Sequence, residues 1–107
     1  MIPKNIKIYE VGPRDGLQNE RINISIENKI KFINLLTLCN YPYIEVGSFV
    51  SSRWVPQMEN SDIIYKKIIK SKKCNYPLLV PNLIGLKNAI GNRVKNICVF
   101  TTASETF

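Results

Sequence analysis

Short apolar runs alternate with longer amphipathic segments along the chain. The apolar runs predict four strands, at residues 6–11, 43–46, 78–80 and 94–101. The segments between them predict three helices: one bounded by Ser25 and Asn40, one over 62–71 and one over 83–91. In the second helix we expect the isoleucines to face inward, including Ile68 and Ile69. The polar stretches 12–24 and 48–60 are expected to be loops.

The alternation of strand and helix predicts a parallel sheet with right-handed crossovers. The predicted strands are apolar nearly throughout, as in sheets that are covered on both faces. Two architectures fit this order: an open doubly wound sheet, or part of a (β/α)8 barrel. The stretch 12–16 is not the G-x-G-x-x-G of dinucleotide-binding folds. Polar residues gather just after the predicted strand ends, which is where the active sites of barrels lie.

Composition and charge narrow the class of protein. The chain has 107 residues, of which 45% are hydrophobic and 21% charged, enough for one small globular domain. The net charge is +7, but the basic residues are scattered and their densest run, 66–73, falls largely on a predicted helix. We therefore expect a solvated helix face and no nucleic-acid partner. Nothing approaches the roughly 20 apolar residues of a membrane span, and the first strand begins too early to leave room for a targeting peptide.

The cysteines point to a reducing compartment. Cys39, Cys74 and Cys98 are widely spaced, and the chain has no histidine, so a zinc site built from this chain alone is excluded. An odd count without a secretory signal fits a cytoplasmic location. We expect three ordinary buried or half-buried thiols, with Cys98 in the core of its strand.

The candidate chemistry lies at the corner after the first strand, Gly12 to Asp15. Asp15 is a hard oxygen ligand suited to Mg²⁺ or Mn²⁺. Arg14 is a fixed cation whose planar fork can bind a carboxylate or stabilise an enolate oxygen. Glu45 ends the second strand at the same rim, where it could move a proton or orient Arg14. Further polar side chains that follow strand ends could bind a substrate: Gln18, Ser48, Asn82 and Thr101.

Each of these residues also has a structural interpretation. Asp15 before a glycine is a common turn element, and Arg14 with Glu45 could be a structural ion pair. Asn82 after a proline could bond its own backbone in a turn. Phe49 and Trp54 in the second polar stretch are expected to be packing residues.

Two long motifs carry a resemblance to a known family. The stretch VGPRDGLQNE, residues 11–20, resembles the signature of hydroxymethylglutaryl-CoA lyase, a family of metal-dependent lyase and synthase barrels. The similarity continues through YIEVGSFVS at 43–51 and RWVPQM at 53–58. It then reaches 81–83 and 99–105, so it covers essentially the whole chain. By this resemblance, the fold is α/β, the N-terminal half of a TIM barrel of about four βα units, and 1–107 form one partial barrel domain.

The resemblance also implies a reaction and roles for individual residues. The family splits hydroxymethylglutaryl-CoA into acetoacetate and acetyl-CoA. Asp15 would bind a divalent metal, Mg²⁺ or Mn²⁺, and Arg14 would contact the thioester oxygen and stabilise the enolate. Glu45 would complete the catalytic set, and Gln18 and Ser48 would bind the acyl-CoA substrate beside Arg14.

The chain also departs from the family pattern. A family barrel has eight strands, a His-x-His metal pair and a catalytic cysteine in a glycine-rich loop. This chain has no histidine, and none of its three cysteines lies in a glycine-rich loop. We therefore expect an incomplete copy of the lyase, from a fragment, a split gene or a decayed gene, without activity on its own. Its partner would be a complementing C-terminal half or a second copy in a homodimer. The alternatives are a condensing synthase of the same barrel group and a non-catalytic half-barrel or basic binding module.

Overall fold

The computed structural model describes residues 1–105. The chain forms short parallel strands, three α-helices and two shorter helical turns. In chain order they are β1 (Tyr9–Glu10), η1 (Gly12–Gly16), α1 (Ile26–Thr37), β2 (Tyr43–Ile44), β3 (Gly47–Ser48), η2 (Pro56–Met58), α2 (Ser61–Lys67), β4 (Leu78–Leu79), α3 (Leu83–Gly91) and β5 (Ile97–Cys98). Within the described part, no helix is long and apolar enough to cross a membrane.

The strands follow one another in space in the order of the sequence, and all pairs are parallel. Strand β1 pairs with β2, β3 pairs with β4, and β4 pairs with β5. Segments β2 and β3 behave as one strand, because the amide of Glu45 bonds the carbonyl of Glu10 at 2.8 Å while the amide of Val46 bonds that of Pro77 at 3.0 Å. A doubly wound sheet would reverse direction at some point. The sequential order instead belongs to a barrel wall, which confirms the predicted half-barrel fold.

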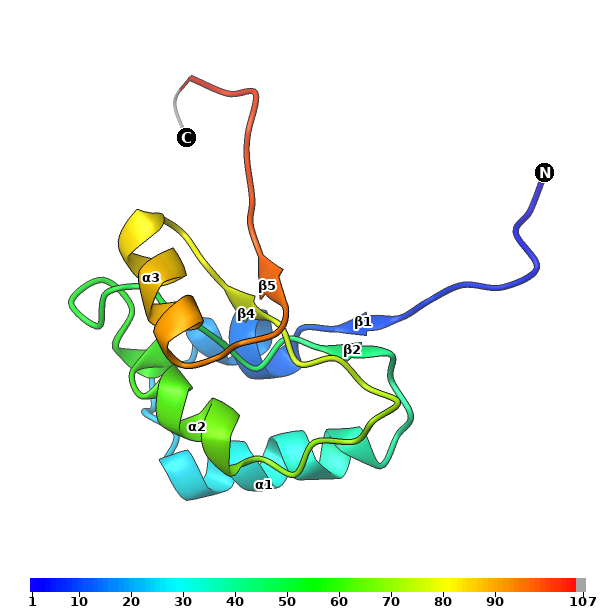
Figure 1. The fold of residues 1–107 in the computed structure, drawn as a ribbon, viewed down its shortest axis with the longest axis horizontal. Coiled ribbons are helices and arrows are strands. Elements are labelled where there is room, and N and C mark those ends of the chain that lie inside the picture. Colours follow the sequence, from blue (N-terminus) through cyan, green and yellow to red (C-terminus); the bar gives the residue numbers. More distant parts are fainter. Residues whose placement is uncertain (106–107) are drawn as a thin grey trace.

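In Figure 1, α1 lies below the strands and α2 and α3 lie to their left, whereas the N-terminal segment leaves to the right and the C-terminal segment leaves upward. The side chain of Ser25 caps α1 by accepting a hydrogen bond from the amide of Asn28 at 3.1 Å. Asn82 caps α3 in the same way, accepting from the amide of Gly85 at 2.8 Å. The core between helices and strands is apolar and fully buried. Its central side chains are Ile33, Ile44, Ile64 and Leu78.

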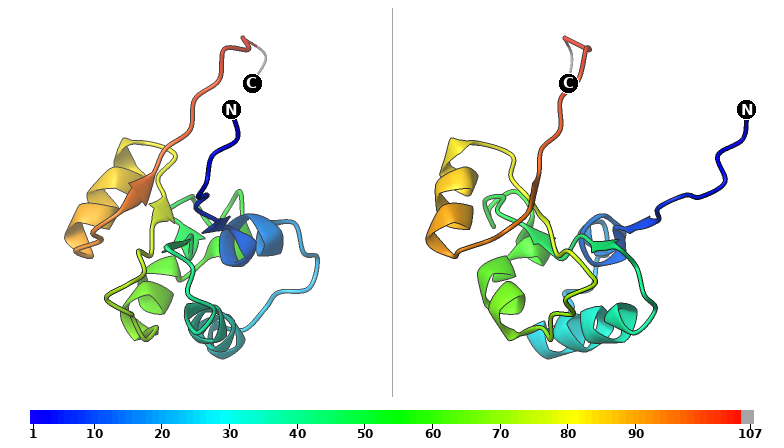
Figure 2. Two further views of the ribbon diagram at one scale, coloured as in Figure 1. Left: turned by 90° about the vertical axis from the view of Figure 1, so that its right-hand side faces the viewer. Right: turned by 45° about the vertical axis from the view of Figure 1, so that its right-hand side comes forward.

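Several predicted strands are longer than the observed ones. Of 6–11 only Tyr9–Glu10 forms a ladder, and of 94–101 only Ile97–Cys98 does. These are the two outer strands, and each has a neighbour on one side alone. Residues 1–8 and 99–105 leave the body as single segments (Figure 2). Ile6 and Val99 are 78% and 73% exposed, so the prediction that both faces of these strands are covered is wrong for this chain.

Other expectations about packing were also wrong. The second helix ends at Lys67, because Ile68 takes an extended conformation with ψ of 151°. Ile68 is buried, whereas Ile69 points outward and is exposed. Trp54 is 83% exposed and does not pack, although Phe49 does pack against the core.

The cysteines lie nearer the surface than the sequence suggested. Cys39 is exposed at the end of α1, contrary to the expectation of a buried or half-buried thiol. Cys74 and Cys98 are half-buried. Cys98 is not in the core, because it lies in β5, the last strand of the wall among the described residues.

Candidate active-site corner

The polar stretch after β1 is a helical turn rather than an open loop. The carbonyl of Val11 accepts hydrogen bonds from three successive amides, those of Arg14, Asp15 and Gly16, at 3.1, 2.7 and 3.2 Å. Pro13 occupies the first turn, where its missing N–H costs nothing, and its ring is buried. At Gly12 an added Cβ would lie 3.4 Å from the Phe32 ring and 2.8 Å from Oε1 of Glu10, which is the movable end of a flexible side chain. The Gly-Pro pair therefore packs the corner tightly before the chain presents Arg14.

Arg14 is the centre of the corner. Its Nε donates to Oε1 of Glu45 at 3.0 Å, and its Nη1 donates to both Asp15 and Gln18 at 3.3 Å. The Arg14 side chain is 18% exposed, that of Asp15 62% and that of Glu45 only 4%. The structure thus brings four of the five predicted site residues into one hydrogen-bonded cluster.

Glu45 lies where β2 passes into β3, with its backbone bonded to β1. A carboxylate buried to this degree is costly unless a cation pairs with it. Arg14 supplies that cation, and its Nη1 donates to the more exposed Asp15 and Gln18. The pair is therefore structural and at the same time orients the guanidinium toward the rim.

Ser48 is the predicted site residue that stays outside this cluster. It is 2% exposed, its amide donates to Oγ of Ser61 at 3.1 Å, and its hydroxyl donates to the carbonyl of Leu79 at 3.3 Å. It lines a separate cavity of about 580 Å³ together with Asn82. Asn82 serves as a helix cap, as its structural interpretation predicted, and Thr101 is exposed in the projecting end segment.

The described residues supply only part of a metal site. They contain no group of three or more histidine, cysteine or acidic side chains that could hold an ion. The carboxylate of Asp15 is exposed and held by Arg14, so it fits the role of one hard oxygen ligand. Glu45 is engaged by Arg14, and Glu10 by the amide of Gly12 at 2.8 Å. The other ligands of a divalent ion must come from outside the described residues.

Two residues that the sequence interpretation passed over lie beside the ion pair. The ring of Tyr9 stacks on that of Tyr43, with centroids 5.2 Å apart, and its hydroxyl contacts Sγ of Cys98 at 2.5 Å. Burial raises the pKa of both the Tyr9 hydroxyl and the Cys98 thiol above their ordinary values. Both groups therefore stay neutral at neutral pH. Placing the first two predicted strands side by side would have revealed the tyrosine pair, since Tyr9 and Tyr43 are in register.

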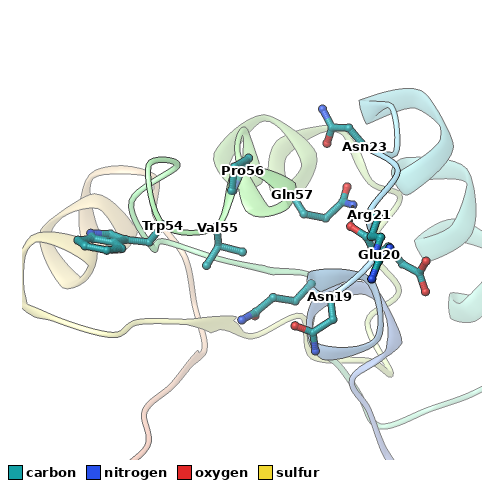
Figure 3. Close-up of a pocket in the computed structure, with 9 residues that line it drawn as sticks. Asn19, Glu20, Arg21, Asn23, Trp54, Val55, Pro56 and Gln57 are labelled. Atoms are coloured by element: carbon teal, nitrogen blue, oxygen red, sulfur yellow. Dashed lines mark hydrogen bonds between the residues drawn. The ribbon is translucent and has the colours of Figure 1, made fainter. Parts of the chain in front are cut away.

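A cavity of about 490 Å³ adjoins the corner (Figure 3). Its two walls come from separate stretches of the chain, residues 18–23 and residues 54–57. Gln57 points from one wall toward the other, whereas Trp54 points away (Figure 3). Neither polar stretch has a hydrophobic period, so no sequence signal indicates this contact.

Comparison with known proteins points to one family. The model of the HMGL-like family matches residues 5–107. The mitochondrial hydroxymethylglutaryl-CoA lyase of Rattus norvegicus is 46% identical over 106 residues, which are 99% of this chain and 33% of that protein. The 3-hydroxy-3-isohexenylglutaryl-CoA/hydroxymethylglutaryl-CoA lyase of Pseudomonas aeruginosa is 45% identical over 106 residues, 99% of this chain and 35% of that protein. The chain spans about a third of the length of these relatives.

Solved structures agree with the sequence comparison. The crystal structure of hydroxymethylglutaryl-CoA lyase from Pseudomonas aeruginosa superposes with a TM-score of 0.93 at 46% identity, over 98% of this chain and 35% of that one. A lyase from Acinetobacter baumannii in complex with coenzyme A and 3-methylmalate gives 0.90 at 34% identity, over 94% of this chain and 33% of that one. By sequence and by fold, the chain belongs to the HMGL-like family and corresponds to the N-terminal part of its lyase barrels.

Proposed function

We propose that this chain forms one wall of the active site of a hydroxymethylglutaryl-CoA lyase. The reaction is cleavage of 3-hydroxy-3-methylglutaryl-CoA into acetoacetate and acetyl-CoA. The observation that carries the proposal is the cluster in which buried Glu45 holds Arg14 so that its guanidinium faces Asp15 and Gln18. The identity of about 46% to lyases over the whole chain supports it.

Arg14 stabilises charge in this proposal. Breaking the carbon–carbon bond leaves an enolate of the acetyl thioester, whose oxygen gains negative charge. Because Glu45 engages Nε, the guanidinium is held in place, and its Nη1 remains directed toward Asp15 and Gln18. A preorganised cation at the position where charge develops is a large source of rate enhancement. Gln18, bonded to the same guanidinium, and Ser48 are proposed to bind the substrate.

Asp15 is the proposed metal ligand of this wall. A bound Mg²⁺ or Mn²⁺ would act as a Lewis acid toward the substrate oxygens. The exposure of Asp15 leaves its carboxylate accessible from the rim, and Arg14 fixes its direction. A single carboxylate holds such an ion weakly, so we propose that this chain alone has no activity above background. The missing histidine ligands would come from a complementing C-terminal half, since a second copy of the chain also lacks histidine.

The cellular location belongs to the same proposal. Similar lyases carry both cytoplasmic and mitochondrial names in Rattus norvegicus. We propose a cytoplasmic location, in keeping with three free thiols among the described residues.

A fusion barrel tests the function. It joins residues 1–107 to the remainder of the Bacillus subtilis lyase, which is 46% identical to this chain over 104 residues. With Mn²⁺ present, we expect it to release acetoacetate from hydroxymethylglutaryl-CoA and not to condense acetyl-CoA with 2-oxo acids. Asp15→Asn should reduce release to background, while the matched change Glu27→Gln on the outer helix α1 should not. Condensation without cleavage would instead assign a synthase.

A further inference from the structure

The side chain of Gln57 bonds the backbone of residues 20–24, the stretch that follows the corner. Its Oε1 accepts a hydrogen bond from the amide of Ile24 at 2.9 Å. Its Nε2 donates to the carbonyls of Glu20 and Ile22 at 3.2 and 2.9 Å. Residues 20–24 belong to no helix or strand, so these three bonds fix a stretch that has no ladder of its own.

Gln57 is itself held firmly in place. It lies in the helical turn η2 and is 5% exposed. Its backbone carbonyl accepts a hydrogen bond from the ammonium of Lys29, which is 6% exposed on α1. The burial of Lys29 keeps its charge away from water and lowers the pKa of the ammonium. A buried amide with every polar atom bonded, braced by a buried cation, is a rigid anchor.

The anchored stretch is linked to Arg14 through the backbone. The amide of Glu20 donates to the carbonyl of Leu17 at 3.0 Å. The amide of Leu17 in turn bonds the carbonyls of Gly12 and Arg14 at the end of η1. A movement of 20–24 therefore reaches the turn that carries Arg14 and the adjacent Gln18 through two steps of hydrogen bonding.

We propose that Gln57 is a positioning residue for the corner: it fixes residues 20–24 as one wall of the adjoining cavity and thereby sets the position of Gln18 and Arg14. We call the three hydrogen bonds from Gln57 to residues 20–24 the clamp. The expected effect of the clamp on catalysis rests on the proposed lyase function, whereas the hydrogen bonds themselves do not. Gln57 contacts none of the residues that we place at the reacting atoms. Its effect is expected on the placement of the wall and not on the chemistry of a single group.

Two substitutions separate the bonds that Gln57 makes. Gln57→Met keeps the shape of the side chain and removes all three bonds. Gln57→Glu keeps an acceptor for the amide of Ile24 but turns an oxygen toward the carbonyls of Glu20 and Ile22. Asn34→Leu is the matched control, because Asn34 also bonds a backbone amide, that of Ile69 at 2.9 Å, far from the corner.

Hydrogen exchange in the full chain tests the clamp. In Gln57→Met we expect the amides of Ile24 and Leu17 to exchange about tenfold faster or more, because both depend on the clamped stretch. In Gln57→Glu we expect Ile24 to stay protected and Leu17 to lose protection. Asn34→Leu should change neither amide. Unchanged exchange at Leu17 in both Gln57 variants would overturn the positioning role.

Kinetics in the fusion barrel test the consequence for catalysis. We expect kcat to fall about 10- to 100-fold in Gln57→Met with a smaller change in KM, since a misplaced wall affects the transition state more than binding. Unchanged kcat in a folded variant with faster exchange would overturn the proposal. If the unsubstituted fusion barrel is inactive, the lyase function fails, and the exchange at Leu17 alone decides on the clamp.

Discussion

At the scale of single residues, the Arg14–Glu45 ion pair contributes to the stability of the fold and also holds the side chain that we propose acts in the reaction. Glu45 is among the most buried charged groups of the chain, and its partner Arg14 is the residue proposed to meet the enolate. Its Oε1 accepts the hydrogen bond from Nε of Arg14 at 3.0 Å, so the carboxylate helps to orient that cation. The Arg14–Glu45 pair should therefore influence activity more than it influences folding.

The first prediction separates these two contributions. Glu45→Gln keeps an oxygen that accepts from Nε of Arg14 but removes the negative charge. We expect kcat/KM of the fusion barrel to fall about 100-fold. The free energy of unfolding should fall by only about 1 kcal/mol, because one hydrogen bond remains. Steady-state kinetics and urea unfolding measure the two effects, and a variant with full activity would contradict the orienting role.

The second prediction concerns Cys98 and alkaline pH. Burial raises the pKa of this thiol above its ordinary value of 9.0, so folding favours the neutral form. The stability that it contributes is present below pH 9.0 and is lost as the pH rises through the folded-state pKa. We expect the urea midpoint of the chain to fall above that pH, and to fall less steeply in Cys98→Ala.

A shallower slope, not a flat one, is expected in Cys98→Ala, because burial also raises the pKa values of Tyr9 and Cys74. Cys39→Ala, which removes an exposed thiol, is the control and should keep the slope of the unsubstituted chain. Identical slopes in Cys98→Ala and Cys39→Ala would show that the Cys98 thiol is not shielded in the fold.

At the scale of elements, the sequence predicts best what local signals determine. Helix α3 was expected over 83–91 and forms at Leu83–Gly91, because a capping asparagine and a terminal glycine mark its ends. Arg14 and Glu45 could be paired in advance, since they follow neighbouring parallel strands. The turn η1 could not be foreseen, because the three amides that share the carbonyl of Val11 leave no period in the sequence.

The hydrogen bonds of Gln57 to residues 20–24 could not be predicted from the sequence either. They join Gln57 to a stretch 33 to 37 residues earlier, from side chain to backbone. Such bonds leave no period in the sequence. Trp54 was assigned to packing because of its size, yet it lies on a turn with no layer over it among the described residues.

The third prediction tests the close contact of β3 with α2. A Cβ at Gly47 would lie 2.9 Å from Cβ of Ser61, so Gly47→Ala forces the helix away from the strand. We expect a loss of about 1–3 kcal/mol in the free energy of unfolding, as for other overpacked sites. Gly91→Ala is the control, because no atom lies within 4 Å of its added Cβ. Equal melting temperatures for the two variants would contradict this packing.

At the scale of the whole molecule, the chain is a barrel wall with two open edges. Among residues 1–105, strands β1 and β5 each pair on one side only, and apolar residues of both end segments are exposed, such as Ile8 at 55%. Unpaired parallel edges of this kind invite pairing with another chain. In the related lyases, whose chains are about three times as long, further residues are available to cover such edges.

The fourth prediction follows from these edges. The purified chain should elute above its monomer mass of 12.3 kDa in size-exclusion chromatography with light scattering. Ile8→Lys should shift it toward the monomer, because a charge beside β1 opposes edge pairing. Ile90→Lys alters an isoleucine on α3 that is also exposed, at 68%, and should not shift it. A monomer at all concentrations would contradict the open-edge description.

The measurement that tests the central claim most directly is acetoacetate release from hydroxymethylglutaryl-CoA with Mn²⁺ by three samples: the chain, the remainder of the Bacillus subtilis lyase, and the fusion barrel. The proposed function predicts release by the fusion barrel alone, because the Arg14 corner and the missing metal ligands must lie in one barrel. Release by the chain alone, or none by a folded fusion barrel, would contradict the assignment of this corner as one wall of the lyase site.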